Sequence, residues 1–286
     1  MLTYPDIDPI AFGIGSWSVR WYGLTYLAGF AAFWLLGRYR AGRPDSGWRR
    51  EEMDDLLFYA AIGAVLGGRL GYVLFYDFAR LAADPVSLIR IWEGGMSFHG
   101  GLIGVLVAMW LYGRATKRGF FQVTDFIAPL VPLGLGLGRI GNFINAELWG
   151  KTTALPWGMV FPNAGPLARH PSQLYQALLE GLALFAVLWL FSRKPRPPMA
   201  VSGVFLIGYG VFRGLVEFVR VPDQHIGYLA FDWLTMGQLL CVPMLIAGAA
   251  LVYLASRECS PDPVALQPVV DYSPVRRRKQ RRKRQK

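Results

Sequence analysis

The chain has 286 residues, of which 53% are hydrophobic and 17% charged, and its mean hydropathy is +0.32. A water-soluble domain carries about 25% charged residues, so this composition argues against that class. The two cysteines, Cys241 and Cys259, are too few and too badly placed for a disulfide framework, and much of the net charge of +11 lies at the C-terminus.

Apolar segments recur along the chain, with lengths near the roughly 20 residues that a helix needs to cross a bilayer. In chain order they are Trp21–Gly37, Leu56–Tyr76, Phe98–Gly113, Phe126–Phe143, Leu174–Phe191, Val201–Val219 and Met236–Leu254. The first follows no basic region and is too long for the apolar core of a signal peptide, so we expect it to be retained. The predicted fold class is all-α, a polytopic integral membrane protein with about seven transmembrane helices.

The distribution of arginine and lysine predicts the orientation, because these residues accumulate in cytoplasmic loops. They are concentrated after the first, third, fifth and seventh segments. We therefore expect the N-terminus outside and the C-terminus in the cytoplasm. Residues 1–256 are predicted to form one membrane catalytic domain, and residues 257–286 a basic, disordered cytoplasmic tail. Nucleic-acid binding is one interpretation of such a tail; we favour an orientation signal and a tether to anionic lipid, and expect no nucleic-acid partner.

Two long connections, Asp77–Met96 and Asn145–Pro171, fall on the predicted outer side and contain tryptophans and several prolines. They are expected to form extracytoplasmic cap or arm segments. Anchoring of aromatic side chains at the membrane surface explains them equally well.

Arg139 lies within the apolar segment Phe126–Phe143. An arginine at membrane depth costs roughly 3 kcal/mol on insertion scales, so it indicates a functional site. Asn142, three positions later, shares its helical face. No acidic residue lies three or four positions from Arg139 in this helix, so its charge must be met by another helix, by water or by an anionic ligand. A salt bridge between helices is the purely structural alternative.

Tyr209, Arg213 and Glu217 follow one another at intervals of four residues, which places them on one helical face. Arg213 and Glu217 can pair within the helix, so a purely structural ion pair is the alternative to a ligand site.

His99 stands at the start of the third apolar segment, before Gly100 and Gly101. The unperturbed pKa of histidine, about 6.5, suits proton transfer at neutral pH. The two glycines allow backbone or substrate to approach closely. A lone histidine is more often a hydrogen-bonding residue with a structural role, and that alternative stays open.

The predicted orientation places these polar residues at one depth. The residues concerned are Tyr22, Arg69, His99, Arg139, Arg213 and Glu217, all in the outer half of the membrane. They predict one site that faces the extracytoplasmic leaflet. Glycines at four-residue intervals occur on the helices that carry Arg69, His99, Arg139 and Arg213, and this spacing favours close helix packing in lipid. We expect these four helices to form one compact bundle.

Several common catalytic patterns are absent from the sequence. It contains no His-Glu-x-x-His metal motif, no Gly-x-Ser-x-Gly elbow and no Cys-x-x-Cys pair. We predict no metal site and no cofactor.

The segment from Gly138 to Gly150, Gly-Arg-Ile-Gly-Asn-Phe-Ile-Asn-Ala-Glu-Leu-Trp-Gly, resembles the signature of the bacterial prolipoprotein diacylglyceryl transferase family. The resemblance covers roughly Tyr4 to Leu254 and departs at Ala146, often glycine in relatives, and at the basic tail. Further matches are Trp21-Tyr22-Gly23, Gly67-Gly68-Arg69, Gly94 to Gly101, His170 to Tyr175 and Tyr209 to Arg213.

The resemblance implies an enzyme of the bacterial inner membrane with its active site toward the periplasmic leaflet. It implies transfer of the diacylglyceryl group of phosphatidylglycerol to the lipobox cysteine of a preprolipoprotein signal peptide, with release of glycerol phosphate, as the first step of lipoprotein maturation. The implied catalytic residues are His99, Arg139, Arg213, Tyr22 and Glu147. The implied substrate-binding residues are Arg139, Arg213, Asn142, Tyr209, Gly100, Glu217 and Arg69.

The physical chemistry agrees with this assignment, because guanidinium groups at low dielectric stabilise the charge that develops on a departing phosphate. The acceptor supplies the nucleophile, a thiol that must become a thiolate. We hypothesise His99 as the base, with Glu147 and Tyr22 as rivals. The alternative function is a membrane transporter or a lipid-binding scaffold for anionic lipids; such proteins often show inverted repeats, and no convincing repeat is found here.

Overall fold

The computed structural model describes residues 2–15, 17–44, 46–222 and 227–257. The predicted basic tail beyond Arg257, together with Cys259, lies outside the described residues. The described chain is mostly helical, with two small two-stranded sheets.

Each of the seven predicted apolar segments is helical, with ends that differ from the prediction by a few residues. Five correspond to single helices: α1 (Trp21–Ala41), α2 (Glu52–Tyr76), α4 (Phe98–Thr116), α9 (Ala200–Glu217) and α10 (Met236–Arg257). The other two are composite rods. One joins α5 (Phe120–Ile127), the 3₁₀ turn η3 (Ala128–Leu130) and α6 (Val131–Ile144). The second joins α7 (Ser172–Gln176), a π-helical segment η4 (Ala177–Ala183) and α8 (Leu184–Phe191).

Five of these rods are long and apolar enough to cross a membrane: Glu52–Tyr76, Phe120–Ile144, Ser172–Phe191, Ala200–Glu217 and Met236–Arg257. Helices α1 and α4 fall outside this group, since each carries glycine together with tryptophan, tyrosine or histidine, which lower the mean hydropathy. The described chain is thus an all-α, multi-pass membrane protein.

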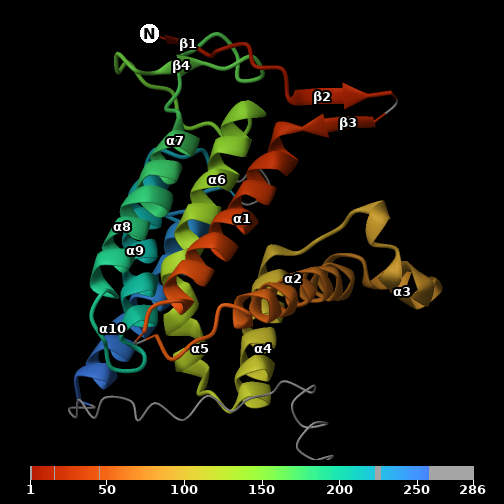
Figure 1. The fold of residues 1–286 in the computed structure, drawn as a ribbon. Coiled ribbons are helices and arrows are strands. Elements are labelled where there is room, and N and C mark those ends of the chain that lie inside the picture. The colour runs from red at the N-terminus through yellow and green to blue at the C-terminus, as the bar shows by residue number, and fades with distance from the viewer. Residues whose placement is uncertain (1, 16, 45, 223–226, 258–286) are drawn as a thin grey trace, which may run out of the picture.

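The small sheets, which the apolar pattern did not predict, lie at one end of the helices (Figure 1). Strand β2 (Ile10–Ile14) pairs antiparallel with β3 (Trp17–Arg20), directly before α1. Strand β1 (Leu2–Thr3) pairs in parallel with β4 (Met159–Val160) from the predicted outer connection. The Tyr4 hydroxyl donates to the carbonyls of Phe143 at 2.7 Å and Ile144 at 2.9 Å, which ties this cap to the end of α6.

Glycines bring α2 and α4 into backbone contact, as their spacing predicted. A Cβ atom on Gly63 would lie 2.5 Å from the carbonyl oxygen of Gly104. A Cβ on Gly67 would overlap the carbonyl oxygen of Gly100, and one on Gly100 would overlap that of Gly67. A side chain at these positions would therefore force the two helices apart.

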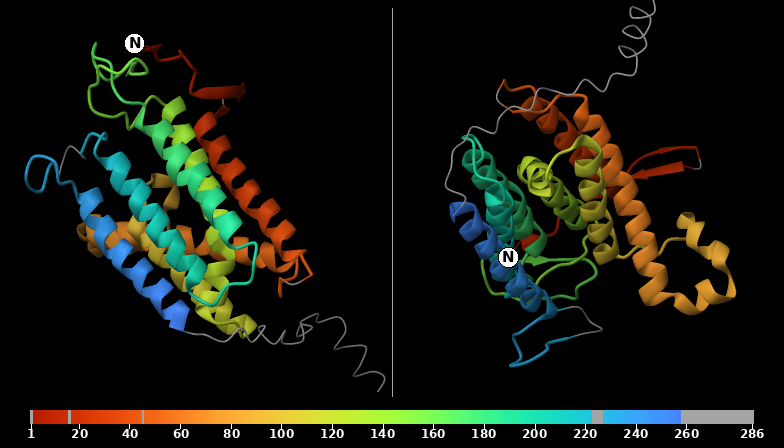
Figure 2. Two further views of the ribbon diagram at one scale, coloured as in Figure 1. Left: turned by 90° about the vertical axis from the view of Figure 1, so that its left-hand side faces the viewer. Right: turned by 90° about the horizontal axis from the view of Figure 1, so that it is seen from below.

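The expectation of one compact bundle of the four charged helices needs correction. Helix α2 packs mainly on α4, while α6 packs on α1 and the π segment, and α9 packs on α10. Figure 1 shows α2 leaving α1 at a steep angle and carrying α3 (Phe78–Ala83) away from the other helices, and the view from below in Figure 2 shows the same separation. The glycine pattern predicts close pairs of helices but does not determine which helices pair.

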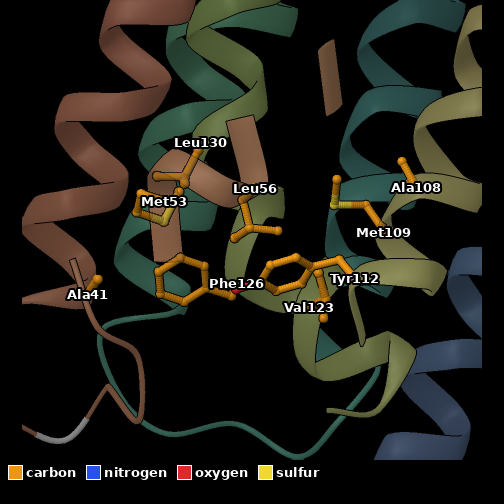
Figure 3. Packing of buried hydrophobic residues seen from close by; sticks show 9 residues of the cluster. All are labelled: Ala41, Met53, Leu56, Ala108, Met109, Tyr112, Val123, Phe126 and Leu130. Atoms are coloured by element: carbon orange, nitrogen blue, oxygen red, sulfur yellow. The ribbon is translucent and has the colours of Figure 1, made fainter. Parts of the chain in front are cut away.

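A buried apolar cluster joins the two groups of helices at the other end of the molecule (Figure 3). Met53 and Leu56 of α2 lie fully buried among side chains of the neighbouring helices. The remaining members are Ala41, Ala108, Met109, Tyr112, Val123, Phe126 and Leu130. An ion pair between the partly exposed Arg118 and the buried Glu52, 2.8 Å apart, lies beside the cluster. The α2–α4 pair is thereby attached to the other helices at this end.

Candidate functional site

Arg139 lies in the last two turns of α6, on the same face as Asn142. Its Nη1 donates to Asn142 Oδ1 at 3.4 Å, and Asn142 Nδ2 donates to Glu147 Oε1 at 2.8 Å. Asn145 Nδ2 donates to the same carboxylate oxygen at 3.3 Å. An ordered chain of polar groups therefore connects a half-buried guanidinium to an exposed carboxylate. No ion pair is found for Arg139 among the described residues, so the structural alternative of an interhelical salt bridge is not seen there.

Tyr22, in the first turn of α1, packs against Gly141 on this face of α6. A Cβ on Gly141 would lie 3.1 Å from the Tyr22 ring and 2.5 Å from the Thr25 hydroxyl. Tyr22 is within electrostatic range of both Arg139 and Glu147. Its hydroxyl lies 3.0 Å from that of Tyr26.

Arg213, on α9, is surrounded by acceptors. Its Nη2 lies 3.0 Å from Glu217 of the same helix, so the in-helix ion pair that the spacing allowed is present. Its Nη1 lies 3.8 Å from Glu180 and donates to Gln176 Oε1 at 3.3 Å, both on the rod α7–η4–α8. Tyr209, one turn earlier on α9, is within electrostatic range of both Arg213 and Arg139.

Glu217 is held from several directions and is only 2% exposed. Besides Arg213, it lies 3.6 Å from Arg220 and accepts a 3.1 Å hydrogen bond from the Thr235 hydroxyl. A Cβ on Gly237 would lie 2.6 Å from its carboxylate, so the start of α10 closes over it. Glu217 therefore acts as the fixed ionic partner that keeps Arg213 in place.

Glu180 is a member of this group that the sequence reasoning missed. It lies in the π-helical segment and is 1% exposed, yet neither carboxylate oxygen has a hydrogen-bond partner in the described part of the chain. Both Arg139 and Arg213 are within its electrostatic range. The rule that pointed to Arg139, an ionisable residue inside an apolar segment, applies equally to Glu180 and would have found it.

Close backbone packing explains how Glu180 reaches Arg139. Gly136 of α6 and Gly181 of the π segment face each other, and a Cβ on Gly181 would lie 2.7 Å from the Cα atom of Gly136. Near the outer end, the Gln173 amide donates to the Glu147 carbonyl at 2.6 Å. These contacts hold the rod α7–η4–α8 in a fixed register against α6. Such π-helical segments occur frequently at functional sites.

Arg69, predicted to bind substrate, has a different environment. It is 5% exposed and its three guanidinium nitrogens donate to four backbone carbonyls, those of Leu88 at 3.1 Å, Gly95 at 3.2 Å, Ser87 and Gly94. These carbonyls belong to the arm that contains α3 and the short 3₁₀ helices η1 (Pro85–Ile89) and η2 (Ile91–Glu93). The hydrogen bonds of Arg69 therefore hold the arm, and none joins it to Arg139 among the described residues; its substrate-binding function stays a prediction.

His99 and Gly100 belong to the α2–α4 pair. The His99 side chain is exposed and lines a small surface pocket of about 220 Å³ with Tyr72, Tyr76, Met96, Ser97 and Phe98. Gly100 lies against Gly67 and Gly71 of α2, so its function in the structure is close helix packing. Within the described ranges, no hydrogen bond or ion pair joins His99 to the residues around Arg139. The predicted single site therefore separates into a charged group on α6, α9 and the π segment, and a histidine pocket on α2 and α4.

The charged group suits an anion better than a metal. No cluster of three or more metal-ligating side chains is found among the residues that the structure describes. Arg139 and Arg213 both lie within electrostatic range of Glu180. Arginine suits phosphate because its planar fork forms paired hydrogen bonds. Fold and site together describe a multi-pass helical membrane protein with a group of charged side chains between its helices.

Comparison with known proteins identifies the family. The profile described as prolipoprotein diacylglyceryl transferase matches residues 9–254, and the chain belongs to that family. A relative from Pseudomonas paraeruginosa is 60% identical over 265 residues, covering 93% of this chain and 100% of its own length. Relatives from Ectopseudomonas mendocina and Oleidesulfovibrio alaskensis are 60% and 59% identical, covering 89% and 90% of this chain and 96% of their own lengths. All three are named phosphatidylglycerol–prolipoprotein diacylglyceryl transferase.

Proposed function

We propose that this enzyme transfers the diacylglyceryl group of phosphatidylglycerol to the cysteine thiol of a prolipoprotein and releases glycerol phosphate. The names of relatives at 60% identity over nearly the whole chain support this reaction. The structural observation that carries it is Arg139, a guanidinium within an apolar rod that forms no ion pair among the described residues and lies within electrostatic range of Arg213. Such a charge is retained at membrane depth for an anionic ligand.

The reaction forms one bond and breaks one. The cysteine sulfur attacks the glycerol carbon that carries the phosphate, a carbon–sulfur bond forms, and the carbon–oxygen bond to the phosphate breaks. The phosphodiester thereby becomes a phosphomonoester with an additional negative charge. Arg139 and Arg213 hold the phosphate and stabilise this charge as it develops, in a site where burial strengthens the interaction. The phosphate site between the two arginines is lined by Tyr22, Asn142 and Tyr209.

The thiol proton must pass to a base before or during the attack. His99 is our proposed base, and Glu147 is its rival because the amide of Asn142 links Glu147 to Arg139. Proton transfer to His99 requires the start of α4, where His99 lies, to face the phosphate site. Near-normal turnover of His99→Gln at saturating substrate would reject His99 as the base, and a strong loss in Glu147→Gln would then favour Glu147.

We further propose that all seven rods cross the bacterial inner membrane, with the N-terminus in the periplasm and the C-terminus in the cytoplasm. The asymmetry of arginine and lysine between the two ends supports this orientation. It puts the Arg139 group in the periplasmic leaflet, where the lipobox cysteine of a translocated preprolipoprotein becomes accessible. Cysteine accessibility labelling of substitutions in the loops after α1 and α2 tests it: reagents confined to the periplasm should label only the second.

The function is tested by incubating the purified protein with phosphatidylglycerol vesicles and a lipobox peptide. A diacylglyceryl peptide and an equal amount of glycerol phosphate are expected by mass spectrometry. Movement of intact phosphatidylglycerol between leaflets, with no modified peptide, would instead support the transporter alternative. A peptide in which serine replaces the lipobox cysteine serves as the matched control and should stay unmodified.

A further inference from the structure

The charged group around Arg139 contains two carboxylates that are held in different ways. Glu217 lies 3.0 Å from Arg213 and also contacts Arg220 and Thr235. Glu180 lies 3.8 Å from Arg213 and forms no hydrogen bond within the described part of the chain. Burying a carboxylate without hydrogen bonds, as at Glu180, costs folding free energy. Glu217, by contrast, is an ordinary partner in an ion pair. Glu180 therefore calls for an explanation that a salt bridge alone does not provide.

The backbone holds Glu180 beside both arginines without providing it with donors. The contact between Gly136 and Gly181 fixes the π segment against α6, one residue from Glu180 and three from Arg139. Two further buried atoms on the same rod, Gln173 Oε1 and Gln176 Nε2, also have no hydrogen-bond partner among the described residues. Gln176 and Glu180 of this rod both contact Arg213, so the rod presents a polar face with unpaired atoms to that arginine.

Apart from the exposed Glu147, which lies beyond Asn142, the group contains five charged side chains. Arg139, Arg213 and Arg220 contribute three positive charges, and Glu180 and Glu217 contribute two negative ones. Tyr209 and the thiol of Cys241 also face Arg213. With both carboxylates ionised, the group carries one net positive charge. This charge balances the single negative charge of a phosphodiester.

We propose that Glu180 is a charge-setting residue that limits the arginine site to one net positive charge, so that it retains the phosphodiester substrate and releases the dianionic phosphomonoester. This inference rests on the proposed function. A phosphomonoester carries about −1.5 to −2 charges at neutral pH, since its second pKa is near 6. After the carbon–oxygen bond breaks, the additional charge lies beside the Glu180 carboxylate and is repelled. The same arginines that stabilise the departing phosphate then do not trap it.

The test compares two soluble anions as inhibitors of the full-length protein in detergent at pH 8. Glycerol 1-phosphate represents the dianionic product, and glycerophosphoglycerol, the deacylated headgroup, represents the singly charged diester. In the wild type, the inhibition constant of the dianion should be equal to or higher than that of the diester. In Glu180→Gln, which is nearly isosteric and neutral, the dianion should bind at least about tenfold more tightly relative to the diester, as expected for removal of one nearby charge in a partly buried site.

A matched control is Glu52→Gln, which removes a buried carboxylate paired with Arg118 at the other end of the molecule. It should leave the ratio of the two inhibition constants unchanged. Glu180→Asp, which keeps the charge, should also preserve the wild-type ratio. Lowering the pH to 5, below the second pKa of the phosphomonoester, should reduce the difference between Glu180→Gln and the wild type. A purely structural function of Glu180 would weaken both anions together and leave their ratio unchanged.

An unchanged ratio in a folded, active Glu180→Gln protein would overturn the inference and leave the proposed function intact. If Glu180→Gln does not fold, the wild-type measurement decides, because a tenfold preference of the wild type for the dianion contradicts the proposal. Failure of the wild type to modify the lipobox peptide would instead overturn the proposed function, and that result comes from a separate assay.

Discussion

Two regions of this protein bury arginine in apolar helices, and they use it differently. On the α2–α4 pair, Arg69 directs all three guanidinium nitrogens to backbone carbonyls of the arm. Arg139 on α6 donates to the side-chain amide of Asn142. Arg213 on α9 donates to the amide of Gln176 and lies 3.8 Å from the Glu180 carboxylate. Arg69 donates from all three nitrogens to its own chain, whereas Arg139 and Arg213 are the arginines that we propose to bind the phosphate.

The contrast shows that burial of a charge at membrane depth does not by itself identify a catalytic residue. The cost of insertion is similar for the three arginines. Their partners distinguish them. The four backbone carbonyls that bind Arg69 neutralise no charge, but they fix the arm to α2.

Replacing Arg139 should abolish most activity without unfolding the protein. We expect both Arg139→Ala and Arg139→Lys to lose about a hundredfold or more in turnover, the range seen when one donor to a developing oxyanion is removed. Lysine keeps the charge but lacks the planar fork that binds phosphate through two hydrogen bonds. Peptide lipidation measures turnover, and thermal unfolding in detergent should show little change. Substantial activity in Arg139→Lys would indicate that charge alone suffices.

Replacing Arg69 should have the opposite outcome. Arg69→Ala removes hydrogen bonds from four backbone carbonyls, and each buried polar group left unpaired costs about 1–3 kcal/mol. We expect a large fall in unfolding temperature and easier proteolysis between Asp77 and Met96, with activity falling only in proportion to the folded fraction. If Arg69→Ala keeps its stability and loses turnover as Arg139→Ala does, Arg69 belongs with the phosphate-binding residues after all.

The glycine contact between α2 and α4 can be separated from the charged group by mutation. In Gly104→Ala the added Cβ would overlap the carbonyl oxygen of Gly63, and overpacking of this kind costs about 1–3 kcal/mol. Gly214→Ala is the matched control, because a Cβ there meets nothing within 4 Å, and the change should raise helix stability by up to about 1 kcal/mol. Unfolding temperatures should therefore shift in opposite directions, and equal shifts would contradict the close packing of α2 and α4.

The smallest expected effect concerns His170, outside the helices. Burial lowers the pKa of His170 below its usual value of about 6.5, so the folded protein binds this proton less readily than the unfolded chain. Its contribution to stability is then complete above about pH 6.5 and is lost as the pH falls through the lowered pKa. The unfolding temperature of the wild type should decline over this range, and His170→Asn should reduce the slope. An identical slope in both proteins would exclude His170 as a contributor.

Local patterns predicted much of the architecture and part of the site. The apolar segments became helices within a few residues of their predicted ends, because the length of an apolar run and the need to satisfy backbone groups leave little choice in a membrane. Asn142 beside Arg139, and Glu217 beside Arg213, followed from helical spacing alone. The pairing of β1 with β4 escaped prediction, since these two strands are distant in the sequence.

Charge, hydropathy and helical period are properties of neighbouring residues, so the sequence by itself determined the membrane class, the polar positions and the family resemblance. Only the tertiary structure decided which arginine meets backbone carbonyls, which meets a carboxylate, and that Glu180 completes the charged group. Those outcomes depend on which helices pack together and in what register, and glycine contacts between residues far apart in the chain set that packing.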